Sequence, residues 1–135
     1  MKPHCVLDAS ALLAWLFQEP GASVVTQALG KGAVISSINW SETLQKLLHR
    51  GITPDKVSED LTQRQVLDKA LNIVPFSRQD AGEVASLVNE TSKYGLSLAD
   101  RACLVLACRL NIPALTADKV WGNLHLPELD IKLIR

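Results

Sequence analysis

Residues 98–118 read LADRACLVLACRLNIPALTAD, and this stretch decides the fold class. Its first part predicts a helix, because its apolar side chains recur with the i, i+3, i+4, i+7 spacing of one helix face. They stand at Ala99, Ala102, Cys103, Leu106, Ala107 and Leu110. The apolar run Pro113-Ala114-Leu115 follows after a short connection and predicts a buried strand. A helix that leads into a short buried strand is typical of α/β proteins.

The rest of the chain repeats this alternation of short apolar runs and helical segments. Further runs that predict strands are Cys5-Val6-Leu7, Ala33-Val34-Ile35, Asn72-Ile73-Val74 and, more weakly, residues 131–134. Helical stripes between them are Leu44, Leu47 and Leu48, and Ala81, Val84, Ala85 and Val88. Strands that are apolar on both faces and alternate with helices predict a parallel sheet covered on two sides. The expected fold is therefore an α/β three-layer sandwich.

The connection between the second and third strands predicts two helices. Pro54 followed by Asp55 indicates the start of the second of them, since proline favours the first helical position. We expect this helix to reach about Ala70.

The composition indicates a single globular domain over residues 1–135, with 47% hydrophobic and 21% charged residues. We expect no membrane span, because charged residues interrupt the apolar stretch 98–110, and no signal peptide, because Asp8 breaks the first apolar run. The three cysteines lack the paired spacing of a zinc site and are interpreted as buried thiols in a reducing, cytoplasmic compartment. The net charge of zero gives no overall basic surface for nucleic acid.

Four acidic residues stand where a parallel sheet binds its ligands, beyond the carboxyl ends of the strands, where helix N-termini also point. Asp8 ends the first predicted strand, and Asp118 follows the fourth. Glu42 falls in the first turns of the helix after the second strand, and Asp100 falls in the first turn of the helix near residue 99. All four carboxylates can therefore converge on one rim of the sheet.

Each carboxylate also has a purely structural interpretation. Asp8 and Asp118 each precede a predicted helix and can serve as its N-cap. The Ser97 to Asp100 segment fits a capping box, and the Asn39 to Glu42 segment is a looser variant of one. Taken singly, the four residues leave both interpretations open.

The joint placement favours a metal site. Two carboxylates 4 Å apart repel by roughly 4 kcal/mol at an effective dielectric constant near 20, and a divalent cation or raised pKa values must relieve this repulsion. Oxygen ligands without histidine or cysteine suit Mg²⁺ or Mn²⁺. Such an ion can activate water and neutralise a phosphodiester, so the expected chemistry is phosphodiester hydrolysis. Three polar neighbours are expected in supporting roles: Ser10, Asn39 and Thr116.

Four segments carry a resemblance to a known family: VLDASA at 6–11, SSINWSE at 36–42, GLSLADR at 95–101 and LTAD at 115–118. In this order and spacing they resemble the PIN-domain ribonucleases, and specifically the VapC-type toxins of toxin–antitoxin modules. The resemblance spans essentially the whole chain. It implies a five-stranded parallel sheet flanked by helices, and usually a homodimer.

The resemblance also implies a site and a function. The residues that match the family's acidic positions are Asp8, Glu42, Asp100 and Asp118, and those that match its hydroxyl positions are Ser10 and Thr116. It assigns Mg²⁺ or Mn²⁺ to the four carboxylates, mainly to Asp8 and Asp118. Glu42 and Asp100 either hold metal or position the attacking water. The implied activity is endonucleolytic cleavage of a transfer or ribosomal RNA, which stops translation, and the implied partner is a cognate antitoxin that wraps the helices and blocks the site.

Other interpretations of the same pattern differ in how well they fit. A haloacid-dehalogenase-type enzyme needs a second aspartate where Ser10 stands, and a response-regulator receiver needs one at the end of the third strand, where Pro75-Phe76-Ser77 occurs. The alternative from a different class is a non-catalytic RNA-binding or protein-interaction module on the same fold. A repulsive acidic cluster argues for the enzyme, since a binding module has no need of one.

Overall fold

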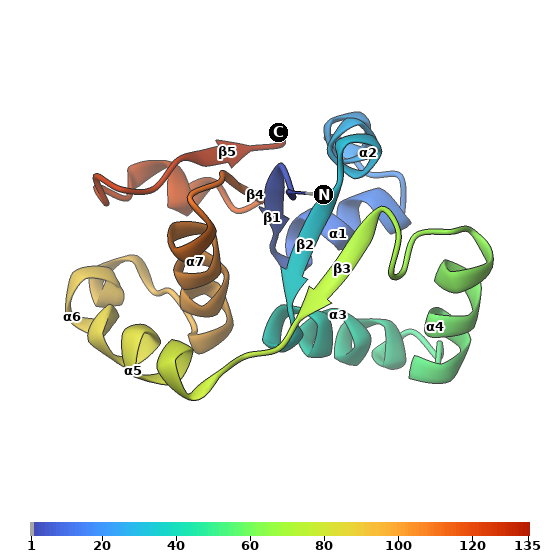
Figure 1. The fold of residues 1–135 in the computed structure, drawn as a ribbon, viewed down its shortest axis with the longest axis horizontal. Coiled ribbons are helices and arrows are strands. Elements are labelled where there is room, and N and C mark those ends of the chain that lie inside the picture. The colour runs from blue at the N-terminus through green and yellow to red at the C-terminus, as the bar shows by residue number, and fades with distance from the viewer. Residues whose placement is uncertain (1) are drawn as a thin grey trace.

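Five short strands form one parallel sheet in the computed structural model, which describes residues 2–135, and the sheet order is β3-β2-β1-β4-β5 (Figure 1). The strands are β1 (Cys5–Leu7), β2 (Ala33–Ser36), β3 (Leu71–Val74), β4 (Ala114–Thr116) and β5 (Ile131–Leu133). Each coincides with a run that the sequence predicted as a strand. In this order β1 is central, and it pairs with β2 on one side and with β4 on the other.

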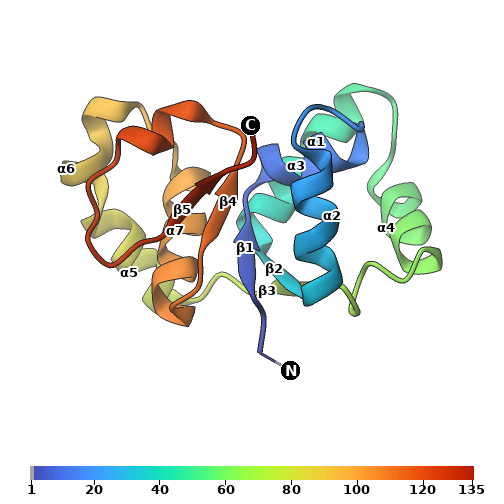
Figure 2. The ribbon, with the colours of Figure 1, turned by 90° about the horizontal axis from the view of Figure 1, so that it is seen from above.

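Helices cover both faces of the sheet and confirm the predicted three-layer α/β sandwich. The α-helices are α1 (Ala9–Leu16), α2 (Ala22–Lys31), α3 (Ser37–His49), α4 (Pro54–Gln63), α5 (Arg78–Ser86), α6 (Val88–Thr91) and α7 (Leu98–Leu110). Two 3₁₀ turns, η1 (Ser92–Tyr94) and η2 (Lys119–Asn123), complete the set. In both ribbon views α1 to α4 lie on one side of the sheet and α5 to α7 on the other (Figures 1 and 2).

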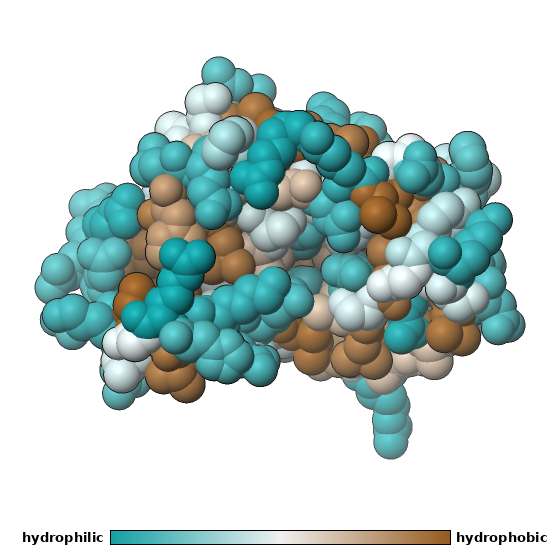
Figure 3. All heavy atoms as spheres, turned by 180° about the vertical axis from the view of Figure 1, so that it is seen from behind, coloured by the Kyte–Doolittle hydropathy of each residue, from teal (hydrophilic) through white to brown (hydrophobic). Residues whose placement is uncertain are grey.

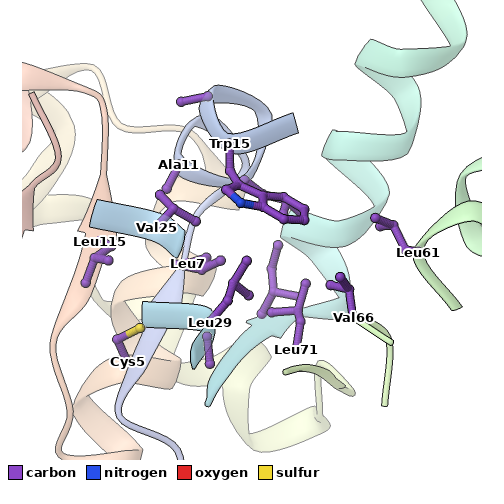
Figure 4. Packing of buried hydrophobic residues seen from close by; sticks show 14 of the residues in the cluster. Cys5, Leu7, Ala11, Trp15, Val25, Leu29, Leu61, Val66, Leu71 and Leu115 are labelled. Carbon is purple, nitrogen blue, oxygen red and sulfur yellow. The ribbon is translucent and has the colours of Figure 1, made fainter. Parts of the chain in front are cut away.

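Alternate residues of the strands face the two helical layers. Leu7 and Ile35 join the cluster built with α1 to α4, whereas Val6 and Val34 join the cluster built on α7. Both faces of the central strands are thus buried, which explains why these strands are continuously apolar in sequence. Figure 4 shows the first cluster, in which Trp15 from α1 packs near Leu71 at the start of β3.

The tryptophans serve mainly in packing. Trp121 is completely buried and Trp15 is 9% exposed. Trp40 is half-buried and packs against the first cluster from α3.

Two expectations from the sequence were wrong. The helix that begins at Pro54 ends at Gln63 rather than near Ala70, because the backbone turns into the left-handed region at Gln65 (φ 59°) and buries Val66 against the first cluster. The three cysteines are free, but Cys108 is exposed, whereas Cys5 and Cys103 are buried as expected.

The interpretation of Glu42 depends on the start of α3. Ser36, rather than Asn39, is its N-cap, since the Ser36 hydroxyl accepts the hydrogen bond of the Ile38 amide. Glu42 therefore lies in the second turn of α3 and takes no part in a capping box.

Within residues 2–135 the structure has no helix that is both long and apolar enough to cross a bilayer.

Candidate acidic site

The candidate site lies at the carboxyl ends of the adjacent strands β1 and β4. Asp8 follows β1 directly, and Thr116 is the last residue of β4. Register pairs Leu7 with Leu115, so Asp8 and Thr116 leave the sheet side by side. The first turns of α3 and α7 meet this edge, because β2 runs directly into α3 and α7 packs on β1 and α3. The sheet topology therefore gathers residues that are more than a hundred positions apart.

Asp8 is the most buried carboxylate of this edge, with 4% of its surface exposed. Its Oδ1 accepts hydrogen bonds from the Ala11 amide (2.8 Å) and the Ser10 hydroxyl (2.7 Å). Its Oδ2 accepts a hydrogen bond from the Thr116 hydroxyl at 2.5 Å. The amide contact is the N-cap bond of α1, so the structural interpretation of Asp8 is confirmed. The hydroxyl contacts show that Asp8 is more than a cap.

The hydroxyl groups of Ser10 and Thr116 each connect a backbone amide to Asp8. The Ser10 oxygen accepts a hydrogen bond from the Ala117 amide at 2.9 Å, and the Thr116 oxygen accepts one from the Asp118 amide at 3.0 Å. Because both hydroxyl protons point to the carboxylate, each hydroxyl has a single orientation available to it. Ser10 and Thr116 therefore hold both oxygens of Asp8 in place.

Burial raises the pKa of Asp8 from its ordinary value of 3.8 to about 6. The hydrogen bonds from Thr116, Ala11 and Ser10 oppose this shift, and the negative charge of Asp100 adds to it. The fold thus keeps a carboxylate in a position where its charge is poorly compensated, which is typical of functional sites.

Asp100 and Glu42 extend the acidic site from two helices. Asp100 forms the predicted capping box with Ser97 at the start of α7, in which its Oδ2 accepts a hydrogen bond from the Ser97 amide at 2.9 Å. Glu42 is half-buried on α3 and lies 3.9 Å from the ammonium group of Lys46. Burial raises the pKa of Glu42, Lys46 lowers it, and Asp100 raises it further. Asp100 is therefore close enough for its charge to act on both Asp8 and Glu42.

Cys103 is affected by the same carboxylates. It is completely buried on α7, and burial is the main cause of its raised pKa. The charges of Asp8, Asp100 and Glu42 all raise it further. Asp8, Glu42 and Asp100 therefore all act on the same buried thiol.

Asp118 caps a short helix in this structure. Its backbone amide donates a hydrogen bond to the Thr116 hydroxyl. Its side chain is exposed and caps η2 by accepting a hydrogen bond from the Val120 amide at 3.0 Å. The N-cap interpretation of Asp118 is confirmed.

Asn39 links the two helices that carry Glu42 and Asp100. It is completely buried, and its Nδ2 donates a hydrogen bond to the carbonyl oxygen of Ala99 at 2.9 Å. Its Oδ1 is buried without a hydrogen-bond partner among the described residues. Asn39 therefore sets the distance between α3 and the first turn of α7.

Sequence reasoning missed Lys46 as part of this site. The signal was available, because Lys46 follows Glu42 by four residues, the spacing at which helical side chains meet. The Arg101 guanidinium donates a hydrogen bond to the carbonyl oxygen of Val84 and so ties α7 to α5.

The donor chemistry fits a hard divalent cation, since it consists of carboxylate, hydroxyl and amide oxygens. The side chains are not gathered into a ready cluster: across residues 2–135, no group of three or more His, Cys, Asp or Glu residues is positioned to hold a metal ion. The reason lies in the local contacts, because Asp100 is held by Ser97 and Asp118 by the Val120 amide.

Comparison with known proteins places this architecture in a family. The sequence matches the PIN domain family over residues 5–125. No curated protein matches it. Among solved structures, a chain of a toxin–antitoxin complex from Klebsiella pneumoniae is similar, with a TM-score of 0.68, 18% identity, and 93% of this chain and 94% of that chain covered.

Two further structures have a similar chain. One is VapBC from Salmonella typhimurium bound to DNA, with a TM-score of 0.69, 14% identity and 98% of both chains covered. The other is VapBC2 from Rickettsia felis bound to a promoter DNA fragment, with a TM-score of 0.65, 20% identity, and 96% of this chain and 97% of that chain covered. These structures share the fold along nearly the whole chain. Since the family match also spans most of the sequence, this chain belongs to the PIN-domain family.

Proposed function

We propose that this chain is a Mg²⁺- or Mn²⁺-dependent endoribonuclease and the toxin of a toxin–antitoxin pair. It hydrolyses phosphodiester bonds in a transfer or ribosomal RNA in the cytoplasm and so inhibits translation. The observation that carries the proposal is Asp8, a buried carboxylate with a pKa raised to about 6, held by two hydroxyls and facing the charge of Asp100. A nearby cation stabilises the charged form of such a buried carboxylate. Membership of the PIN-domain family supports the proposal, as does the presence of similar chains in toxin–antitoxin complexes.

The proposed ligands of the ion are the four carboxylates Asp8, Glu42, Asp100 and Asp118. A bound divalent ion lowers the pKa of a coordinated water and neutralises charge on the phosphodiester. Asp8 is already oriented for this role by Ser10 and Thr116. Asp100 and Asp118, which cap α7 and η2 in this structure, would have to give up these cap bonds to act as ligands, and relief of the repulsion between carboxylates would offset that loss.

The supporting residues act through position. Ser10 and Thr116 keep both oxygens of Asp8 in place, and Asn39 keeps α3 at a constant distance from the start of α7. We assign Glu42 either to the metal or to the attacking water, with Lys46 holding its side chain in the absence of RNA.

The proposed assembly is a homodimer with a cognate antitoxin. A shallow apolar hollow of about 330 Å³ between α5 and α7 supports a second copy as one partner. Exposed apolar side chains border it, with Val88 44% and Leu98 55% exposed. Apolar side chains that lie together on a protein surface are a common feature of protein–protein contacts.

The test is cleavage of total RNA in the presence of Mg²⁺ or Mn²⁺. We expect cleavage by the wild-type chain and none by Asp8→Asn or Asp100→Asn, with folding checked by circular dichroism. Glu59→Gln, a change of an exposed carboxylate on α4, is the matched control and should cleave normally. Cleavage that survives both substitutions contradicts the assignment of the site.

A second candidate function is a non-catalytic RNA-binding or interaction module. The absence of a preassembled ligand cluster within residues 2–135 favours it. Isothermal titration with Mn²⁺ separates the two candidates, because the module predicts no binding, whereas the nuclease predicts binding that Asp8→Asn abolishes.

A further inference from the structure

A groove of about 770 Å³ lies between α5, α6, the second half of α7 and residues 126–129. Its floor is apolar and is formed by Leu87, Leu104, Val105, Leu126 and Leu129. The volume falls within the roughly 300–1,000 Å³ range of pockets that bind ligands. Seen from behind, apolar patches interrupt an otherwise hydrophilic surface of the molecule (Figure 3).

The rim of this groove is acidic. Glu83 on α5, Glu90 on α6 and Glu128 before β5 all line it and are exposed. Across residues 2–135, none of these three glutamates forms a salt bridge. The basic residue of the lining, Arg109, is already paired with the buried carboxylate of Asp80. The rim therefore has negative charge that the protein itself does not neutralise.

Cys108 also lines the groove and contacts one of these glutamates. The Cys108 thiol donates a hydrogen bond to the carboxylate of Glu128, with 3.8 Å between sulfur and oxygen. Partial burial raises its pKa, and the charges of Glu128 and of Glu83 on the opposite wall raise it further. The two carboxylates thus act on one point above the apolar floor.

We propose that this acidic groove binds a short basic, amphipathic segment of a partner protein. Apolar side chains of the segment occupy the floor, and its lysine or arginine side chains meet Glu83, Glu90 and Glu128. Charge complementarity selects this occupant. A neutral apolar ligand leaves the three carboxylates unpaired, and the phosphates of nucleic acids or the anionic surface of a membrane are repelled by them.

The groove is separate from the acidic site. Asp100 and Cys108 are eight residues apart on α7, which corresponds to roughly 12 Å along the helix axis. The acidic site lies at the N-terminal end of α7 and the groove at its C-terminal half. The proposal goes beyond the proposed nuclease function and holds or fails independently of it.

The test uses a fluorescein-labelled helical peptide of leucine and lysine, with the same peptide carrying glutamate in place of lysine as its control. We expect the lysine peptide to bind, with an affinity at least about tenfold above that of the control, and to slow the alkylation of Cys108 by N-ethylmaleimide. The triple change of Glu83, Glu90 and Glu128 to glutamine should weaken binding about tenfold, since each exposed charge pair contributes modestly.

Two variants complete the design. Gly82→Leu places a side chain at a lining position where no atom lies within 4 Å, so it should obstruct the groove and weaken binding. Glu59→Gln removes an equally exposed charge on α4 and should leave binding unchanged.

Three results overturn the proposal. The first is equal binding of the lysine and glutamate peptides, and the second is binding that the triple glutamine variant leaves intact. The third is a dimer of the chain alone in which Cys108 is protected from alkylation, because the occupant is then a second copy. RNA cleavage by the triple variant should match the wild type, so failure of either proposal can be recognised separately.

Discussion

Replacing Asp8 with asparagine should make the protein more stable above pH 6, although the substitution removes the central residue of the candidate site. The pKa of Asp8 is raised from 3.8 to about 6, so the folded state binds its proton more tightly than the unfolded chain does. Between about pH 4 and pH 6, folding is therefore coupled to proton uptake, and stability falls as the pH rises. Above about pH 6 the loss of stability caused by ionised Asp8 is complete and no longer changes with pH.

The size of the effect follows from the shift and from the hydrogen bonds that asparagine keeps. A shift of one pKa unit corresponds to about 1.4 kcal/mol, so at pH 8 the ionised Asp8 lowers the free energy of unfolding by about 3 kcal/mol. Asparagine can keep the hydrogen bonds from the Ala11 amide and the Ser10 hydroxyl through its Oδ1. Its NH₂ group is only a donor and cannot replace Oδ2 as the acceptor of the Thr116 hydroxyl. Losing one such bond costs about 1 kcal/mol. We therefore expect Asp8→Asn to be about 1 to 2 kcal/mol more stable than the wild type at pH 8.

The assay is urea unfolding followed by tryptophan fluorescence, because Trp15 and Trp121 are buried and report on the core. Measurements at pH 4.5 and pH 8 should contain EDTA, since a bound cation would stabilise the wild type selectively. The advantage of Asp8→Asn should be present at pH 8 and should shrink or reverse at pH 4.5. The matched control, Glu59→Gln, should change stability by less than about 0.5 kcal/mol.

The reasoning is refuted if Asp8→Asn is less stable than the wild type at pH 8 in EDTA. It is also refuted if the difference between the two proteins is the same at both pH values, because burial of the charge then has no role.

Three further predictions concern the network, the metal and the backbone. Thr116→Val removes the hydrogen bond that holds Asp8 Oδ2 and leaves the Asp118 amide without its acceptor, so urea unfolding should show a loss of about 1 to 3 kcal/mol. Mn²⁺ at a hundred times its dissociation constant should stabilise the wild type by about 2.7 kcal/mol in thermal unfolding and leave Asp8→Asn unchanged, and an equal shift in both proteins places the ion elsewhere. Gly82→Ala should stabilise helix α5 by about 0.5 to 1 kcal/mol, because the new Cβ meets no atom. Gly21→Ala should destabilise the protein, since φ there is +97° and a Cβ would lie 2.7 Å from the Ile134 carbonyl oxygen. The melting temperatures of the two variants should therefore move in opposite directions.

The sequence by itself determined the secondary structure and the layers, because both depend on periodicity that is local in the chain. Buried strands such as Val6-Leu7 and the apolar face of α7 are visible as runs and stripes without knowledge of contacts. The capping roles of Asp8, Asp118 and the Ser97 to Asp100 box are equally local, since each joins residues no more than three positions apart. The end of α4 could not be predicted from local sequence, because it depends on the packing of Val66 in the core.

Only the tertiary structure decided how the site is held. The hydrogen bond from Thr116 to Asp8 spans 108 positions, and the bond from Asn39 to Ala99 spans 60, so no local pattern contains them. The pKa of Asp8 is likewise a tertiary property, because burial beneath other elements is its main cause. Sequence spacing can bring carboxylates to one edge of a sheet, but their charge states and their partners depend on the packing of β1, β4, α3 and α7 around them.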